Sequence, residues 1–135
     1  MTDGSLDPAN RSVDAAPDRS GDPTCLFCRI VRGELPARIV ADDDLVLAFH
    51  DIAPRSPTHV LVIPKAHVAS AADLTAADAE LLGRMFATMA AIARDAGIAV
   101  AGYRIVSNVG RWGGQTVDHL HFHLMGGRAF DWPPG

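Results

Sequence analysis

Short runs rich in apolar residues, bounded by polar and turn-forming residues, occur at five places in the chain, as is typical of β-strands. They predict strands over residues 38–41, 45–50, 58–63, 103–108 and 118–125. The acidic turn Asp42-Asp43-Asp44 separates the first two stretches, and Pro64 ends the third. Short links of this hairpin type favour an antiparallel sheet.

A different pattern marks residues 76–96, where apolar side chains recur every three or four positions. The stripe consists of Leu82, Met85, Phe86, Met89 and Ile92. This spacing predicts one long helix whose apolar stripe lies on a sheet. Thr75 and Asp78 resemble a capping box at its start, and Gly97 stands just past its end.

A second, short helix is predicted over residues 25–32 and closed by Gly33. The elements together predict an α+β domain, a five-stranded antiparallel sheet with one long and one short helix. A chain of 135 residues that is 48% hydrophobic and 21% charged is long enough for one core and too short for two.

The first residues differ from the rest in composition. Residues 1–23 are rich in Asp, Ser, Pro, Gly and Ala, and a segment with so little apolar bulk does not offset the entropy lost on ordering. We therefore expect a disordered N-terminal extension over residues 1–23 and a folded domain over residues 24–135.

The charge pattern and the apolar runs exclude several classes of partner. The net charge is −4 and no basic stripe is present, which argues against a nucleic acid polymer. No apolar run approaches the roughly 18 residues that a membrane span needs, and the start lacks the apolar region of a signal peptide. The sequence predicts a cytoplasmic protein with no membrane partner.

The most informative stretch is His119-Leu120-His121-Phe122-His123-Leu124-Met125. In a strand the three histidines share one face and the apolar residues share the other. Imidazoles can attack, relay protons or bind metal near neutral pH, so this row predicts a chemical site. A solvated polar face or a purification tag is the alternative, but the apolar neighbours and the chain that continues beyond them favour the site.

The same stretch has the form of the histidine triad motif, His-apolar-His-apolar-His-apolar-apolar. Other segments resemble the Hint branch of the histidine triad family in the same order: residues 47–54, 57–65 and 102–104, Asn108, residues 113–115 and the closing Trp132-Pro133-Pro134-Gly135. Such spaced motifs in the same order are far more specific than the triad alone. The resemblance runs from about Cys25 to the last residue.

The resemblance implies a fold and an activity. The family's five-stranded antiparallel sheet pairs into a homodimer with a continuous ten-stranded sheet. The implied enzyme is a nucleoside phosphoramidase that cleaves the P–N bond of purine nucleoside 5′-phosphoramidates, AMP or GMP conjugates, through a nucleotidyl-histidine intermediate. Two alternatives stay open: a dinucleoside polyphosphate hydrolase or nucleotidyl transferase, and a nucleotide-binding scaffold protein.

The resemblance also assigns catalytic roles. His121 attacks the α-phosphorus, an imidazole being a good nucleophile whose phosphoryl adduct hydrolyses readily. The backbone around His119 orients it, His59 adds to the cluster, and His123 donates to a phosphate oxygen. Thr116 stands where relatives often carry Ser and keeps the hydroxyl that bonds the phosphate or the leaving group.

The nucleotide pocket follows from the same comparison. Asp51 is expected to accept hydrogen bonds from the ribose, and Ile30, Leu35, Phe49, Ile52 and Leu61 to enclose the purine. The phosphate side and the leaving-group side are assigned to Asn108, Gly114, Gln115, Thr116, His121, His123 and Trp132. Without the resemblance, Phe49 and Leu61 would be interpreted as ordinary strand core. His50 is expected at the surface or behind the site, and Arg111-Trp112 beside the pocket.

Cys25-Leu26-Phe27-Cys28 has the two-residue spacing of a zinc knuckle. Some bacterial relatives supply two further ligands, which match His67 and His119 here. The resemblance therefore implies a closed structural zinc site made of Cys25, Cys28, His67 and His119, with no metal required for catalysis. Two reduced core cysteines or a redox pair are the alternatives.

Overall fold

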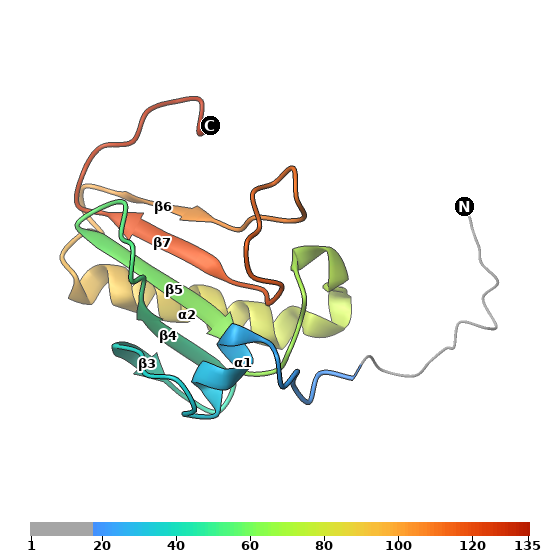
Figure 1. The fold of residues 1–135 in the computed structure, drawn as a ribbon. Coiled ribbons are helices and arrows are strands. Elements are labelled where there is room, and N and C mark those ends of the chain that lie inside the picture. Colours follow the sequence, from blue (N-terminus) through green and yellow to red (C-terminus); the bar gives the residue numbers. More distant parts are fainter. Residues whose placement is uncertain (1–17) are drawn as a thin grey trace.

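A five-stranded antiparallel sheet forms the centre of the protein in the computed structural model, which describes residues 18–135 (Figure 1). The strands are β3 (Ile39–Asp42), β4 (Val46–His50), β5 (Thr58–Pro64), β6 (Tyr103–Val106) and β7 (Phe122–Gly126). They lie in the order β3-β4-β5-β7-β6, and every neighbouring pair is antiparallel. The α+β class and the five-stranded antiparallel sheet predicted from the sequence are confirmed.

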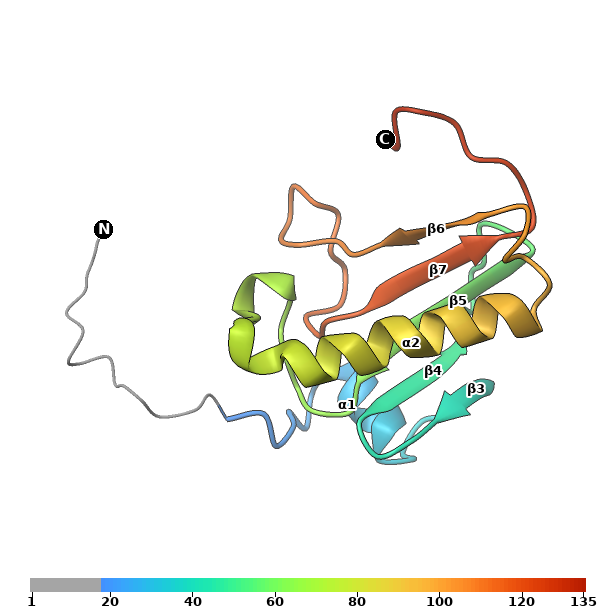
Figure 2. The same ribbon diagram turned by 180° about the vertical axis from the view of Figure 1, so that it is seen from behind.

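Two helices lie on opposite faces of this sheet, α1 (Leu26–Val31) on one and α2 (Ala79–Asp95) on the other (Figures 1 and 2). Two 3-10 turns, Ala71–Asp73 and Ala76–Asp78, lead into α2. Thr75 and Asp78 form the predicted capping box, although the first residues of the predicted helix belong to the second turn. Among residues 18–135, no helix is both long and apolar enough to cross a bilayer.

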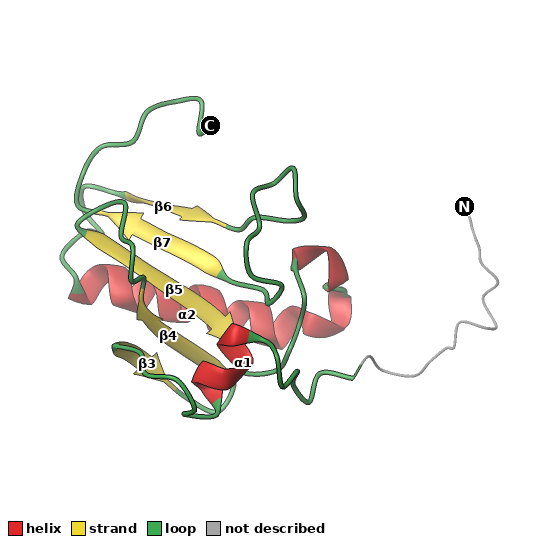
Figure 3. Cartoon of the chain, in the orientation of Figure 1, coloured by secondary structure: helices red, strands yellow, loops and turns green. Residues whose placement is uncertain are grey.

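The predicted ends of two strands are wrong. Strand β6 ends at Val106 rather than at residue 108, and β7 begins at Phe122 rather than at residue 118. The backbone before β7 is bonded elsewhere: the Leu120 N–H donates to the Val68 carbonyl at 2.6 Å, and the Ser107 hydroxyl donates to the His121 carbonyl at 3.0 Å. Alternation reports which side chains are buried, so it continues past the point where the strand ladder stops. Figure 3 shows the chain between β6 and β7 as a loop.

The main core lies between α2 and the sheet. It contains Val46, Ala48, Val60, Val62, Val68, Met85, Met89, Ile92, Leu120, Phe122 and Leu124. Phe86, predicted to lie in the buried stripe, is instead 46% exposed, and its ring meets the Phe122 ring at a centroid distance of 5.2 Å. The predicted stripe is correct for Met85, Met89 and Ile92, which are buried, whereas Phe86 lies at the side of the stripe and its large ring is only partly covered.

A smaller cluster lies on the other face of the sheet, under α1. Phe27 packs there against Leu47, Phe49, Leu61 and Ile63. Because α1 spans only Leu26–Val31, it covers one end of this face and leaves the rest uncovered (Figure 1). The histidines of the triad lie on this face.

The described part of the N-terminal segment is bonded to the domain. Arg19 forms an ion pair with Asp78 at 2.6 Å, and its carbonyl accepts the His67 N–H at 2.9 Å. The Arg19 guanidinium lowers the pKa of Asp78 below its ordinary value. Composition alone does not show such tertiary contacts. Of the extension predicted over residues 1–23, residues 18–23 belong to the described part of the structure, and the prediction for residues 1–17 lies outside it.

Candidate active site and metal cluster

The three triad histidines lie on the face of the sheet that carries α1, as the alternation predicts. His119 and His121 are buried, at 0% and 5% exposure, so this is not an open polar face. The Phe27 ring covers them edge-on, with centroid distances of 5.9 Å to His119 and 5.2 Å to His121. The short helix therefore limits access to the triad from one side.

A backbone carbonyl fixes the proton on the His121 ring. His121 Nδ1 lies 2.7 Å from the His119 carbonyl oxygen, which can only accept a hydrogen bond. Nδ1 must therefore carry a proton, and in the neutral ring Nε2 keeps the free lone pair. An imidazole held in this tautomer presents a nucleophilic nitrogen.

A second cluster joins His123 to two residues of neighbouring segments. His59 Nε2 lies 2.9 Å from His123 Nδ1 and 3.3 Å from Asp51 Oδ2. Burial lowers the pKa of His59, and burial, followed by the nearby His121 and His59, lowers the pKa of His123 to about 4. Both rings are therefore neutral near pH 7.

Two of the triad histidines, His121 and His123, open onto a cavity of about 310 Å³. Eight residues of the predicted pocket line it: Ile30, Phe49, Asp51, Ile52, Leu61, Thr116, His121 and His123. Six further lining residues were not assigned to the pocket from the sequence: Leu26, Phe27, Pro36, Ala37, His50 and Val117. The apolar face of the predicted short helix was the available signal for Leu26 and Phe27, since a short helix on a sheet must bury one face.

His50 and Ile52 mark the rim of this cavity. His50, expected at the surface or behind the site, lines it. Ile52 is 100% exposed, which is unusual for an isoleucine beside a mostly apolar cavity and fits a surface that a ligand covers.

Five predicted pocket residues do not line the cavity: Leu35, Asn108, Gly114, Gln115 and Trp132. Asn108 and Gln115 instead shape the loop that carries Thr116. The Asn108 amide donates to the Gly113 carbonyl at 2.7 Å, and the Gln115 amide donates to the Ala69 and Val117 carbonyls at 2.8 and 3.0 Å. Polar side chains in a glycine-rich loop serve its own backbone as readily as a ligand, which sequence alone does not distinguish.

Both tryptophans of the chain lie outside the cavity within this single chain. Trp132 is 84% exposed in the C-terminal tail, and Trp112 is 95% exposed in the loop between β6 and β7. Arg111 and Trp112, which were predicted to lie beside the pocket, are not among the residues that line the cavity.

The four predicted metal ligands come together. The ligand atoms of Cys25, Cys28, His67 and His119 all lie within 4.8 Å of one another and could hold a metal ion. His119 Nε2 lies 2.8 Å from the Pro64 carbonyl and so donates its proton there, which leaves Nδ1 free to face the sulfurs. Burial lowers the pKa of His119 to about 4, and a neutral ring is the form that binds metal.

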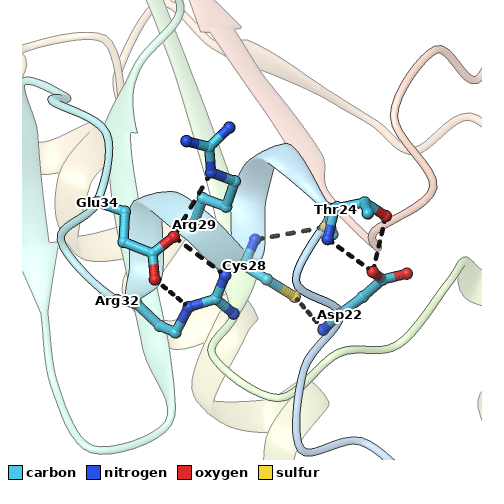
Figure 4. A network of polar contacts seen from close by, with 7 residues as sticks. Asp22, Thr24, Cys28, Arg29, Arg32 and Glu34 are labelled. Carbon is cyan, nitrogen blue, oxygen red and sulfur yellow. Dashed lines mark hydrogen bonds and ion pairs between the residues drawn. The ribbon is translucent and has the colours of Figure 1, made fainter.

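Backbone N–H groups contact both cysteine sulfurs, Cys25 at the N-cap of α1 and Cys28 within the helix. The Cys28 N–H donates to Cys25 Sγ, and the Asp22 N–H donates to Cys28 Sγ, both at 3.4 Å. Figure 4 shows this network, in which Glu34 also pairs with Arg29 and Arg32 beyond the helix end. Burial raises the pKa of the Cys28 thiol.

The second group, made of Asp51, His59 and His123, is also close enough to hold an ion. The Arg55 backbone N–H, however, donates to His59 Nδ1 at 3.0 Å. A neutral ring whose Nδ1 accepts must carry its proton on Nε2, the atom that faces Asp51 and His123. A protonated nitrogen has no lone pair for a metal, so the geometry favours the cysteine cluster as the metal site.

Comparisons with known proteins identify the family. The family model described as "HIT domain" matches residues 32–130. The purine nucleoside phosphoramidase of Escherichia coli K12 is 48% identical over 103 residues, which cover 76% of this chain and 87% of that protein. An uncharacterised HIT-like protein of Synechococcus elongatus is 53% identical over 110 residues, 82% of this chain and 96% of that protein. The crystal structure of a HIT family hydrolase from Legionella pneumophila superposes with a TM-score of 0.81 at 49% identity, covering 82% of this chain and 99% of that one.

Proposed function

The chain belongs to the HIT domain family and is a hydrolase of that family, and from this premise we propose that it is a nucleoside phosphoramidase. The proposed reaction is hydrolysis of the P–N bond of purine nucleoside 5′-phosphoramidates, such as AMP–amine or aminoacyl-AMP conjugates. The observation that carries the proposal is the His121 ring, whose Nδ1–H is held by the His119 carbonyl at the edge of a nucleotide-sized cavity.

The proposed chemistry has two displacements at phosphorus. His121 Nε2 forms a bond to the α-phosphorus while the P–N bond breaks, and the departing nitrogen takes a proton from solvent to leave as the amine. Water then attacks the phosphorus, loses a proton to solvent and returns His121, giving the nucleoside monophosphate. Because Nδ1 keeps its proton throughout, the intermediate is a cationic imidazolium adduct, which is a good leaving group in the second step.

The cavity residues are proposed to recognise the nucleotide. Ile30, Phe49, Ile52 and Leu61 offer an apolar surface for the purine, and Asp51 a carboxylate for the ribose hydroxyls. Thr116 and His123 line the same cavity and offer donors for the phosphate oxygens. Leu35, Asn108, Gly114 and Gln115 are proposed to act by shaping the walls and the loop.

Two alternatives use the same residues. Cleavage of P–O–P bonds in dinucleoside polyphosphates, or nucleotidyl transfer, needs the same nucleophile with another leaving group. A scaffold role needs no nucleophile, so the fixed His121 tautomer argues against it. The name of the Escherichia coli relative favours the phosphoramidase.

Turnover on matched substrates tests the proposal. Adenosine and guanosine 5′-phosphoramidates of alkylamines and amino acids would be compared with dinucleoside polyphosphates by chromatographic release of the monophosphate. We expect kcat/KM at least about tenfold higher on the P–N substrates. The reverse ratio would favour the alternative hydrolase, and binding without turnover would favour the scaffold.

We also propose that the metal is zinc. In a tetrahedral site with bonds of roughly 2.3 Å to sulfur and 2.0–2.1 Å to nitrogen, neighbouring sulfur and nitrogen ligands lie roughly 3.5 Å apart. The cysteine sulfurs here lie 3.2, 3.4 and 3.5 Å from the histidine nitrogens. Two cysteines and two histidines complete four ligands, so bound zinc would stabilise the fold and leave no open position for substrate.

A homodimer is proposed on the edge of the sheet. Strand β6 is an end strand of the sheet, and its outer backbone groups have no strand partner among residues 18–135. Pairing two such edges about a two-fold axis would close both and produce a ten-stranded sheet. The exposed Trp132 of the tail would then be available to the partner's site.

A further inference from the structure

Cys25 and Cys28 lie close together without a bond between their sulfurs. Both are free cysteines, and the two sulfurs lie within 4.8 Å of each other. Cys25 is the N-cap of α1 and Cys28 is the third residue of the helix. In helical geometry, residues three positions apart have Cα atoms roughly 5 Å apart, inside the range of roughly 4.4–6.8 Å that a disulfide spans. A disulfide between them therefore requires rotation of the two side chains and little movement of the backbone.

The two cysteines differ in their access to solvent. Cys25 is half-buried and lines a cavity of about 410 Å³ together with His67 and Thr116. Cys28 is 2% exposed and is not among the residues that line this cavity. A small oxidant that enters the cavity therefore meets Cys25 first, and Cys28 is within reach of the oxidised sulfur.

Oxidation of this pair would remove two of the four candidate metal ligands. The sequence contains two cysteines, so a disulfide within one chain can form only between them. A thiolate sulfur binds metal through its negative charge, and a disulfide sulfur has lost that charge. His67 and His119 would then be the remaining ligands. Two neutral imidazoles do not complete a closed structural site, so a metal held there would be released.

We propose that Cys25 and Cys28 form a reversible disulfide when the protein meets hydrogen peroxide, and that this oxidation releases the metal from the cluster. The first half of the proposal, the disulfide, needs no metal. The second half, the release, rests on the zinc proposed above. Neither half depends on the reaction at phosphorus.

The oxidation has two steps. The Cys25 sulfur attacks one oxygen of the peroxide, the O–O bond breaks, and the departing oxygen leaves as water with the thiol proton, which gives a sulfenic acid on Cys25. The Cys28 sulfur then attacks the Cys25 sulfur, the S–O bond breaks, and a second water leaves with the Cys28 proton. Each sulfur loses one electron and the peroxide gains both. Where the sulfurs are metal-bound thiolates, solvent supplies the two protons.

Thiol and metal titration of the purified full chain tests both halves. Thiols counted in denaturant should fall from two per chain to none after a slight excess of hydrogen peroxide. Zinc should appear at a chromogenic chelator at the same rate. Peptide mass spectrometry should find Cys25 and Cys28 joined with the loss of two hydrogen atoms. A phosphine reductant followed by added zinc should restore both the thiols and the metal.

Three other results would contradict the proposal in different ways. Sulfinic acid in place of a disulfide, or disulfides between chains, would overturn the first half. A disulfide that forms while the zinc stays bound would overturn the second half. Protein that holds no zinc as purified, yet forms the disulfide, would support the first half and overturn the second together with the zinc assignment.

Single substitutions test the order of the two steps. In Cys28→Ser no second thiol remains, so the sulfenic acid on Cys25 should accumulate and be trapped by a cyclic dione. Cys25→Ser should react with peroxide at least about tenfold more slowly, because its remaining thiol is buried. Equal rates in the two variants would overturn the proposed order of attack.

The wild type gives the same information without a substitution. Thermal unfolding identifies a variant that has lost its fold, and the order of attack is then read from the wild type alone. Brief treatment with peroxide and the cyclic dione together should label Cys25 before Cys28. A first label on Cys28 would overturn the proposed order.

Discussion

His119 connects the metal-ligand cluster to His121. Its ring Nδ1 lies 3.4 and 3.5 Å from the two cysteine sulfurs, and its carbonyl oxygen lies 2.7 Å from His121 Nδ1. One residue thus offers its side chain to a metal and its backbone to the nucleophile. A displacement of the His119 ring should therefore move the His119 carbonyl and change the orientation of His121.

His121→Ala should abolish formation of a nucleotidylated protein, because the variant has no nitrogen at the position of the lone pair. The protein would be mixed with a phosphoramidate substrate and quenched during turnover. Mass spectrometry should then show the added mass on the wild type and on Glu80→Ala, a control on α2. Since His121 is buried under Phe27 rather than on an open face, we expect a loss of about 1–3 kcal/mol in stability as well. An adduct that persists on the variant would place the nucleophile elsewhere.

Replacing both cysteines tests the metal cluster. Purified protein should hold close to one zinc per chain, and Cys25→Ser with Cys28→Ser should remove it and lower Tm by several degrees, because ligand binding is coupled to folding. Much of the turnover should remain in this variant, since the cysteines touch no substrate in the proposed mechanism. Metal analysis that finds no zinc in protein prepared without chelators would contradict the assignment.

Stability should depend on pH through His59 and His123. Their pKa values in the folded protein lie below the ordinary histidine value, for His123 at about 4, so the unfolded chain binds more protons. The contribution is therefore complete above pH 6.5, decreases as the pH falls below that value, and levels off near pH 4 for His123. Urea unfolding at pH 7 and pH 4.5 should show the loss, on the order of 2–3 kcal/mol for His123. The free energy of unfolding should depend less on pH in His123→Gln than in the wild type. An equal dependence in the two proteins would show that the pKa of His123 is not lowered by folding.

The ion pair of Arg19 with Asp78 should contribute to stability. Arg19→Ala removes a partly buried ion pair to Asp78, a capping-box residue, and we expect a loss of about 1 kcal/mol by urea unfolding. Arg19→Lys should lose less, because a charge remains although the guanidinium geometry does not. Equal losses in the two variants would show that packing rather than charge is responsible.

Assembly and the C-terminal tail form the last prediction. The protein should sediment as a dimer at micromolar concentration, because β6 otherwise leaves a strand edge unpaired. Trp132→Ala should change the preference among amine leaving groups more than it changes nucleotide affinity, while Trp112→Ala serves as a comparison from another exposed loop. A monomer, or an unaltered amine preference, would contradict the corresponding half of this prediction.

The sequence predicted the sheet, both helices and the gathering of distant ligands, because these follow from periodicity and from motifs whose spacing is chemically constrained. Cys28 and His67 lie far apart in the chain, yet their ligand atoms are 3.2 Å apart, as the family resemblance implied. The sequence did not show that His121 is buried under Phe27, since alternation identifies a face but not what covers it.

Hydrogen-bond detail was beyond the sequence for another reason. The state of His59 depends on a backbone N–H of Arg55, and every residue type except proline offers the same group. The amides of Asn108 and Gln115, predicted to face the phosphate side of the pocket, donate to the backbone carbonyls of Gly113, Ala69 and Val117. Residue type indicates which chemistry is possible, and only geometry shows which partner is chosen.

Two adjacent side chains of α1 face two different sites. Cys28 faces the metal cluster, and Phe27, the next side chain, covers His121 and lines the cavity. Two of the four candidate metal ligands and part of the cavity wall thus lie in one short, contiguous segment. A change in the length or tilt of this helix would alter the ligand cluster and the cavity together, so neither can vary in evolution or design independently of the other.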